Sequence, residues 1–172
     1  MGKRGSDFGF AAAHYTCYAG RMAGPNTNKA AENHMPDMRE FNQKVMNEFR
    51  ANGGKVGGQM AGIPLLLLTM KGAKTGRSLT LPLAYTTDGN RCVIIASKAG
   101  APNNPDWYHN LVANPVVTIE LGSESFQARA TEAKGAERER LYNQQAAQLP
   151  IFAEYQKKTS RQIPVFTLER IG

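Results

Sequence analysis

The sequence predicts an α+β protein built around a small β-barrel of about six mainly antiparallel strands with flanking helices. Three observations support this class. Six short runs carry the apolar or alternating pattern of strands, several consecutive runs are joined by tight turns that favour antiparallel pairing, and three or four other segments are helical. The predicted strands cover residues 65–69, 79–84, 91–97, 116–121, 126–130 and 163–168.

The strands differ in their patterns. Residues 65–69 form a continuous apolar run, which predicts a strand buried on both faces. In residues 79–84 leucines alternate with smaller residues, and Pro82 predicts an edge or a bulge because proline cannot donate a ladder hydrogen bond. Asp88-Gly89 predicts a hairpin turn that joins this strand to residues 91–97. Gly122-Ser123 predicts the turn between residues 116–121 and 126–130.

The predicted helices flank these strands. Asp37 and Glu40 have the spacing of a capping box, and Gly53-Gly54 ends the helix that they begin. Its apolar stripe is interpreted as a cover for the core, with a membrane or acyl-chain contact as the rival interpretation. Asn104 is predicted to cap a second helix with Pro105 at its first position. Two more helical segments are expected at residues 135–148 and 151–158.

Length and charge limit the possible functions. The 172 residues suffice for one domain with a core, and the net charge of +7 indicates an anionic partner. The two cysteines, Cys17 and Cys92, lack metal-ligand spacing and fit a reducing compartment. Residues 1–34 are interpreted as an added leader or a disordered tail, and residues 35–172 as the domain. The longest apolar run is too short to cross a bilayer.

Two loops could bind an anion. Residues 71–78 carry Lys71, Lys74 and Arg77 among glycines, without the spacing of a P-loop. Exposed backbone N–H groups and cations together bind phosphate or carboxylate; a solvated basic turn is the alternative. Ser97 and Lys98 follow a strand and precede a helix start, which also favours an anion, although a plain crossover explains them too.

The remaining candidates are weaker. His14 and His34 lie in the suspected leader, and His109 lacks partners for a triad, so no metal site or triad is predicted. Cys92 is interpreted as a core residue. Phe152 and Tyr155 share one helical face, which indicates either core packing or an aromatic lid over a flat ligand.

Four runs resemble the deazaflavin-dependent nitroreductase family: G-A-K-T-G-R, A-S-K-A-G-A-P-N-N-P-D-W-Y-H-N-L, A-N-P-V-V and R-Q-I-P-V-F. The resemblance covers about residues 65–168. It implies a split β-barrel like that of FMN-binding proteins. It also implies binding of reduced coenzyme F420, a deazaflavin with a phosphate and a polyglutamate tail.

The resemblance also implies site residues. Ser97 and Tyr155 would be catalytic, and Phe152 and Tyr155 would contact the substrate. Phe152 and Leu149 depart from the pattern of members that activate nitroimidazoles, so the resemblance does not imply reduction of bicyclic nitroimidazoles. Leu79 occupies a position that is basic in the family, and Arg77 is the candidate to replace that basic residue. The implied cofactor-binding residues are Lys71, Ala73, Lys74, Thr75, Arg77, Leu79, Pro82, Leu83, Ala84, Ile95, Ala96, Ser97, Lys98, Trp107, Tyr108 and Asn110.

The resulting expectation is a cytoplasmic oxidoreductase that transfers a hydride from reduced F420 to quinones, enones or nitroaromatics. Peripheral association with the membrane stays open, as does a monomeric or homodimeric state. The alternatives are an FMN-binding split-barrel reductase and a non-catalytic carrier of a deazaflavin or acyl chain. A nucleic-acid module ranks last because no aromatic residues interleave with a basic strand face.

Overall fold

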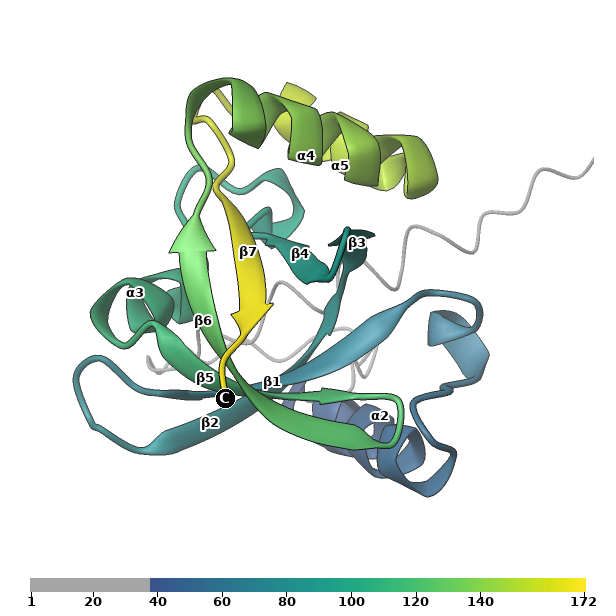
Figure 1. Cartoon of the computed structure of the whole chain (residues 1–172). Helices are drawn as coiled ribbons and strands as arrows, with labels where there is room; N and C mark the ends of the chain where they lie inside the picture. The colour runs from purple at the N-terminus through teal and green to yellow at the C-terminus, as the bar shows by residue number, and fades with distance from the viewer. Residues whose placement is uncertain (1–37) are drawn as a thin grey trace, which may run out of the picture.

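The computed structural model describes residues 38–172, which fold into one strongly curled antiparallel sheet with helices around it (Figure 1). The strands are β1 (Leu65–Lys71), β2 (Ser78–Ala84), β3 (Thr86–Asp88), β4 (Arg91–Ile95), β5 (Val116–Leu121), β6 (Glu124–Glu132) and β7 (Val165–Arg170). The α-helices are α2 (Met38–Ala51), α3 (Asp106–Ala113), α4 (Gly135–Gln148) and α5 (Ile151–Lys157). Two short 3-10 helices are η1 (Gly58–Met60) and η2 (Lys98–Gly100).

The sheet closes on itself through the connection between β2 and β3. The strand order is β2-β1-β5-β6-β7-β4-β3, so β2 and β3 lie at opposite edges although only Tyr85 separates them in sequence. One residue cannot bridge the width of a flat sheet, because neighbouring strands lie about 4.8 Å apart. The sheet must therefore curl until its two edges meet. The backbone N–H of Tyr85 donates to the Pro64 carbonyl at 3.1 Å, next to the start of β1.

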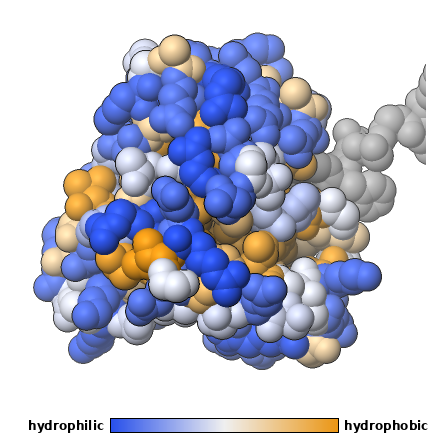
Figure 2. Space-filling view, in the orientation of Figure 1, coloured by the Kyte–Doolittle hydropathy of each residue, from blue (hydrophilic) through white to orange (hydrophobic). Residues whose placement is uncertain are grey.

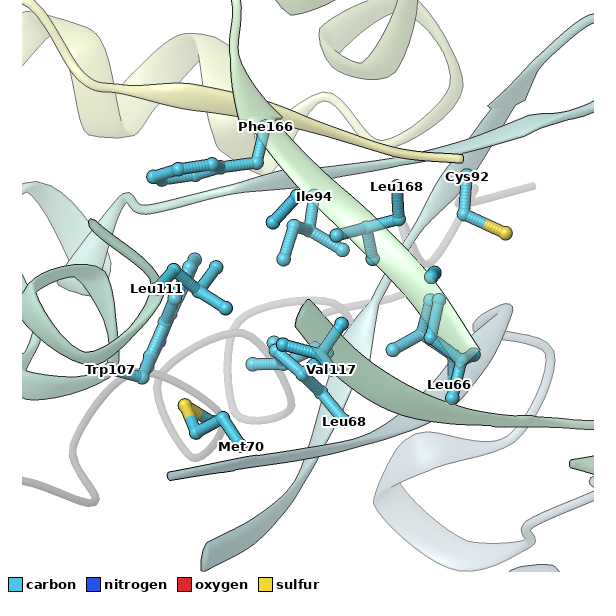
Figure 3. Packing of buried hydrophobic residues seen from close by; sticks show 14 of the residues in the cluster. Leu66, Leu68, Met70, Cys92, Ile94, Trp107, Leu111, Val117, Phe166 and Leu168 are labelled. Carbon is cyan, nitrogen blue, oxygen red and sulfur yellow. The ribbon is translucent and has the colours of Figure 1, made fainter. Parts of the chain in front are cut away.

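The inward-facing side chains of the strands form the main core, shown in Figure 3. Leu66, Leu68 and Met70 point into it from β1, and Trp107 and Leu111 enter from α3. Cys92 belongs to the same cluster and is 6% exposed, as predicted for a core cysteine. Burial raises the pKa of its thiol, so the environment of Cys92 favours the neutral form.

Two smaller clusters cover the outside of the barrel. Val45, Met46 and Phe49 of α2 pack on Leu65 and Leu67, which confirms that β1 is buried on both faces. The apolar stripe of α2 is thus used as a cover for the core. The second cluster joins α4 and α5 to β4 and β7, and both helices lie together at the top of Figure 1. Within residues 38–172, no helix is long and apolar enough to cross a membrane.

The predicted α+β barrel is confirmed, with two corrections to its strands. The structure has seven strands rather than about six, because Thr86–Asp88 forms the short strand β3. The hairpin turn predicted at Asp88-Gly89 is confirmed, but it joins β3 to β4 and not residues 79–84 to β4, because β2 pairs with β1. A bend at Tyr85 divides what reads as one extended segment. The turn residues are Gly89 and Asn90, and Asp88 pairs with Arg91 across the turn.

Other expectations can be compared with the structure. All six predicted strands occur, and Pro82 lies on β2, an edge strand. The second helix begins at Asp106, after Pro105 as the capping residue. Asn104 does not cap it, because the Asn104 side chain accepts a hydrogen bond from Arg161 at 2.7 Å. The proposed leader, Cys17, His14, His34 and the Asp37 half of the capping box lie outside the described residues.

Candidate functional site

The loop between β1 and β2 is a compact, exposed turn rich in cations. The Gly72 N–H donates to the Arg77 carbonyl at 2.8 Å, and the Gly76 N–H donates to the Gly72 carbonyl at 2.9 Å. The Thr75 hydroxyl folds inward and accepts a hydrogen bond from the Arg77 N–H at 3.3 Å. A Cβ at position 72 would lie 2.7 Å from that hydroxyl, so a larger residue there would displace the Thr75 side chain. The loop thereby holds its shape without help from Lys74.

The positive charge of this loop is not balanced by acidic residues. No Asp or Glu occurs in the sequence between Glu48 and Asp88. Lys71, Lys74 and Arg77 are exposed, and none forms an ion pair within residues 38–172. Asp88, by contrast, is paired with Arg91 and Arg140. An unbalanced cluster of cations next to backbone N–H groups favours binding of a phosphate or carboxylate.

Helix α3 connects this basic loop to the second predicted loop. Near its C-terminal end, the Asn110 side chain accepts a hydrogen bond from the Ala73 N–H at 2.9 Å. Asn114, just after the helix, donates to the Lys71 carbonyl at 3.4 Å. The N-terminal end of α3 follows the segment that carries Lys98. An eight-residue helix spans about 12 Å, so α3 separates the basic loop from the second loop by a distance of that order.

The second loop has an unusual backbone. Lys98 and Ala99 have φ values of 46° and 53°, in the left-handed region that few residues other than glycine adopt. Ser97 is 1% exposed. The Lys98 ammonium donates to the Asn103 side chain at 3.3 Å and to the Asn104 carbonyl at 3.5 Å. Lys98 forms no ion pair in the described part of the chain.

The same loop packs against α5, which carries both predicted aromatic residues. A Cβ at Gly100 would lie 2.7 Å from the Tyr155 carbonyl, so the two backbones are in close contact. Phe152 and Tyr155 meet edge to face, with ring centres 5.6 Å apart. Both are buried within the cluster beneath α4 and α5, and the Tyr142 hydroxyl donates to the Phe152 carbonyl. The structure therefore brings the loop of Ser97 and the helix of Tyr155 together.

Several predicted cofactor residues lie in the core. Trp107 is 3% exposed and lies 6.2 Å from the Phe166 ring. Tyr108 is half-buried and donates to Glu132 at 3.4 Å; burial and the Glu132 charge raise the pKa of Tyr108. Pro82, Leu83, Ile95 and Ala96 are also buried, Ala84 is half-buried, and Leu79 is 45% exposed. The structure does not bring Trp107 to the basic surface.

Lys71 occupies a different setting from Lys74. It follows Met70, which faces the core, so Lys71 belongs to the opposite face of β1. There it lines a pocket of about 410 Å³ together with Ser78, Asn114 and residues of β5 and β6. Figure 2 shows that this view of the surface is mainly hydrophilic, with small, separate hydrophobic patches.

Sequence reasoning missed Arg161. The residue lies in the R-Q-I-P-V-F run, but no role was predicted for it. In the structure its guanidinium donates four hydrogen bonds to the segment from Ala96 to Asn104. A signal was present, because an arginine beside a buried strand needs acceptors. The partners could not be found, since they lie about 60 residues away in sequence.

No group of His, Cys, Asp and Glu in residues 38–172 could hold a metal ion. His109 is exposed, and its ring meets that of Tyr108 edge to face at 5.2 Å.

A family model and a curated relative name one family, and a solved structure is an F420-H2 dependent reductase. A model of the F420H(2)-dependent quinone reductase family matches residues 39–170. An F420H(2)-dependent quinone reductase of Mycobacterium tuberculosis is 40% identical over 128 residues, which cover 71% of this chain and 85% of the relative. The solved F420-H2 dependent reductase FDR-A is 39% identical with a TM-score of 0.58, covering 62% of this chain and 94% of its own. A solved chain described as a domain-swapped dimer is 35% identical with a TM-score of 0.60, covering 76% and 96%.

Proposed function

Because this chain belongs to the F420H(2)-dependent quinone reductase family, we propose that it reduces quinones with reduced coenzyme F420, and that enones and nitroaromatics are further acceptors. It is an oxidoreductase whose family uses reduced F420. The relatives' names mention quinones, and the wider set of acceptors rests on the chemistry of hydride transfer to conjugated systems.

The observation that carries the proposal is the exposed basic loop without acidic partners. The F420 tail bears a phosphate and several carboxylates, which need cations and N–H donors. Lys74 and Arg77 supply exposed cations on a loop that Asn110 fixes to α3. Lys98 adds a cation near the other end of α3. These groups fit the negative charge of the tail, whereas nothing in the loop is specific for FMN.

The chain's own residues would bind the cofactor, orient the acceptor and supply a proton. Reduced F420, when bound, supplies the hydride. Ser97 and Tyr155 are assigned to hydrogen-bond the acceptor oxygen, where negative charge develops during reduction. Because these residues are 1% and 0% exposed, the assignment requires α5 to separate from the Ser97 loop when the acceptor binds. Tyr155 is assigned as the proton donor that completes the reduced product. Phe152, on the same helix as Tyr155, is assigned to contact the substrate. Trp107 and Tyr108 would support this region from α3 by packing.

A binding titration tests the cofactor assignment. Adding F420 to the full chain and following its fluorescence should show saturable binding, with FMN added in parallel as a competitor. The Lys74→Glu variant should bind F420 at least 10-fold more weakly. Lys55→Glu is the matched control, because Lys55 lies far from the basic loop. Its neighbour Gly54 contacts Gly122 at the far end of β5, and that strand, about 17 Å long, separates Gly122 from Asn114 beside the basic loop. If Lys74→Glu binds F420 as tightly as Lys55→Glu does, Lys74 does not hold the tail.

Turnover separates the enzyme from a carrier. Oxidation of reduced F420 is followed with a naphthoquinone, an enone and a nitroaromatic as acceptors. Rapid oxidation with the quinone supports the proposal, and tight binding without turnover of any acceptor favours the carrier. Cytoplasmic location, membrane association and a monomeric or homodimeric state stay predictions, which fractionation and light scattering can test.

A further inference from the structure

Arg161 joins the segment before β7 to the loop that follows β4. Its Nε donates to the Ala101 carbonyl at 2.8 Å and its Nη1 donates to the Asn104 side chain at 2.7 Å. Its Nη2 donates to the carbonyls of Ser97 at 2.8 Å and Ala96 at 3.3 Å. One half-buried guanidinium thus contacts the beginning, the middle and the end of the loop from Ala96 to Asn104.

This loop needs an external clamp because its backbone conformation is unfavourable. Lys98 and Ala99 are consecutive non-glycine residues with positive φ, and Gly100 continues the left-handed stretch with φ of 78°. Such residues persist only where the surroundings hold them in place. Two backbone hydrogen bonds lie within the loop: the Gly100 N–H donates to the Ser97 carbonyl at 2.9 Å, and the Ala101 N–H donates to the Lys98 carbonyl at 3.0 Å.

The clamp is linked to Lys98 through Asn104. Arg161 holds the Asn104 side chain, and the Lys98 ammonium donates to the Asn104 carbonyl. A change in the position of Asn104 therefore moves an acceptor of Lys98. Arginine suits this role because its five N–H groups lie in a rigid planar fork that lysine lacks.

We propose that Arg161 is a positioning residue that holds the Ala96–Asn104 loop in the shape that presents Lys98 and the loop N–H groups to the anionic cofactor. Arg161 itself need not touch the cofactor. This inference rests on the proposed function, since it assumes that the chain binds F420 through this loop.

Arg138 provides a matched comparison. It is 5% exposed, and its Nε and Nη2 donate to the Ile163 carbonyl at 3.0 and 2.7 Å. Its Nη2 also donates to Gln156 at 2.8 Å, which fixes the segment between α5 and β7. Arg138 therefore clamps the same C-terminal segment without reaching the Ala96–Asn104 loop through any hydrogen bond among the described residues. A purely structural effect of losing an arginine clamp should appear in both variants.

The experiment compares Arg161→Lys, Arg161→Ala and Arg138→Lys in the full chain. F420 affinity is measured by fluorescence titration, thermal unfolding is measured in parallel, and hydrogen exchange reports on the amides of residues 98–104 without cofactor. We expect both Arg161 variants to bind F420 at least 10-fold more weakly and to exchange these amides faster. Arg138→Lys should lower the melting temperature but change affinity less than twofold. Millimolar guanidinium should partly restore the affinity of Arg161→Ala, whereas equal NaCl should not.

The outcomes separate this inference from the proposed function. If the unaltered chain does not bind F420, both fail. If it binds, and folded Arg161→Lys binds within twofold of it, the positioning role is wrong while the proposed function stands. If Arg161→Ala does not fold, Arg161→Lys decides by itself. Equal losses of affinity in Arg161→Lys and Arg138→Lys would assign Arg161 a general structural role and overturn the inference.

Discussion

The side-chain oxygen of Asn110 accepts a hydrogen bond from the backbone N–H of Ala73 at 2.9 Å. This contact joins α3 to the β1–β2 loop, and the two partners lie 37 residues apart in sequence. It fixes the loop that carries Lys74 and Arg77 to a helix that follows the Lys98 segment in sequence.

Removing this contact should weaken binding of F420. In Asn110→Ala the loop loses one anchoring hydrogen bond, which contributes about 1 kcal/mol, so we expect affinity to fall roughly 5-fold. Fluorescence titration measures the change. Asn143→Ala, an exposed asparagine on α4, should leave affinity unaltered. An unchanged affinity for Asn110→Ala would show that loop anchoring is irrelevant to the ligand.

Gly100→Ala should destabilise the protein. A Cβ there would lie 2.7 Å from the Tyr155 carbonyl and 2.8 Å from the Lys158 Cβ, and the residue has a positive φ. We expect a loss of about 1–3 kcal/mol in the free energy of unfolding, measured by urea denaturation. Gly89→Ala is the control, because it has a similar φ of 62° but nothing within 4 Å of its Cβ. Gly89→Ala should lose less unfolding free energy than Gly100→Ala. A larger loss in Gly89→Ala would contradict the close packing of α5 on the Gly100 loop.

Asp88 should contribute stability that depends on pH. Hydrogen bonds from Arg140 and Arg91 hold the pKa of Asp88 well below its usual range. A lowered folded-state pKa gives stability that is present above the unfolded value, about pH 4, and is lost as pH falls towards the folded value. The difference in unfolding free energy between the unaltered chain and Asp88→Asn should therefore be larger at pH 7 than at pH 3.

The same prediction can be checked by removing the partner. In an Arg140→Gln background the effect of Asp88→Asn should be smaller at pH 7, because one of the two arginines is gone. If the effect of Asp88→Asn on the unfolding free energy is the same at pH 7 and pH 3, the ion-pair explanation is wrong.

The packing of α2 predicts a large effect of truncating Phe49. This side chain is 1% exposed and packs in the cluster between α2 and β1. Phe49→Ala should lower the free energy of unfolding by about 3–5 kcal/mol, because it leaves a cavity. Val112→Ala, at a residue 58% exposed, should change it by less than about 0.5 kcal/mol. Similar small losses in both variants would mean that α2 is not part of the folded core.

Local patterns were sufficient for the elements themselves. The apolar run of β1, the turn at Gly122-Ser123 and the bounds of α4 follow from residues close in sequence, and the structure confirms them. The division of one extended segment into β2 and β3 could not be predicted in this way. Both parts have strand character, and only the partners on either side of Tyr85 show that the chain passes from one sheet edge to the other.

The candidate site, too, was predictable from the sequence only in part. The cations of the β1–β2 loop and the absence of acids around them are properties of the sequence alone, as is the family resemblance that the comparisons bear out. Trp107 was expected at the cofactor from the resemblance, and only the structure shows that it packs in the core.

Amino-acid order by itself therefore determined most of the strands and helices and where positive charge collects, because these depend on neighbours along the chain, while the expected cofactor followed from the family resemblance. Only the tertiary structure decided that the sheet closes at Tyr85, that Asn110 anchors Ala73 and that Arg161 holds the Lys98 loop. Those relationships are hydrogen bonds between residues tens of positions apart, and such pairs are set by the packing of the whole barrel.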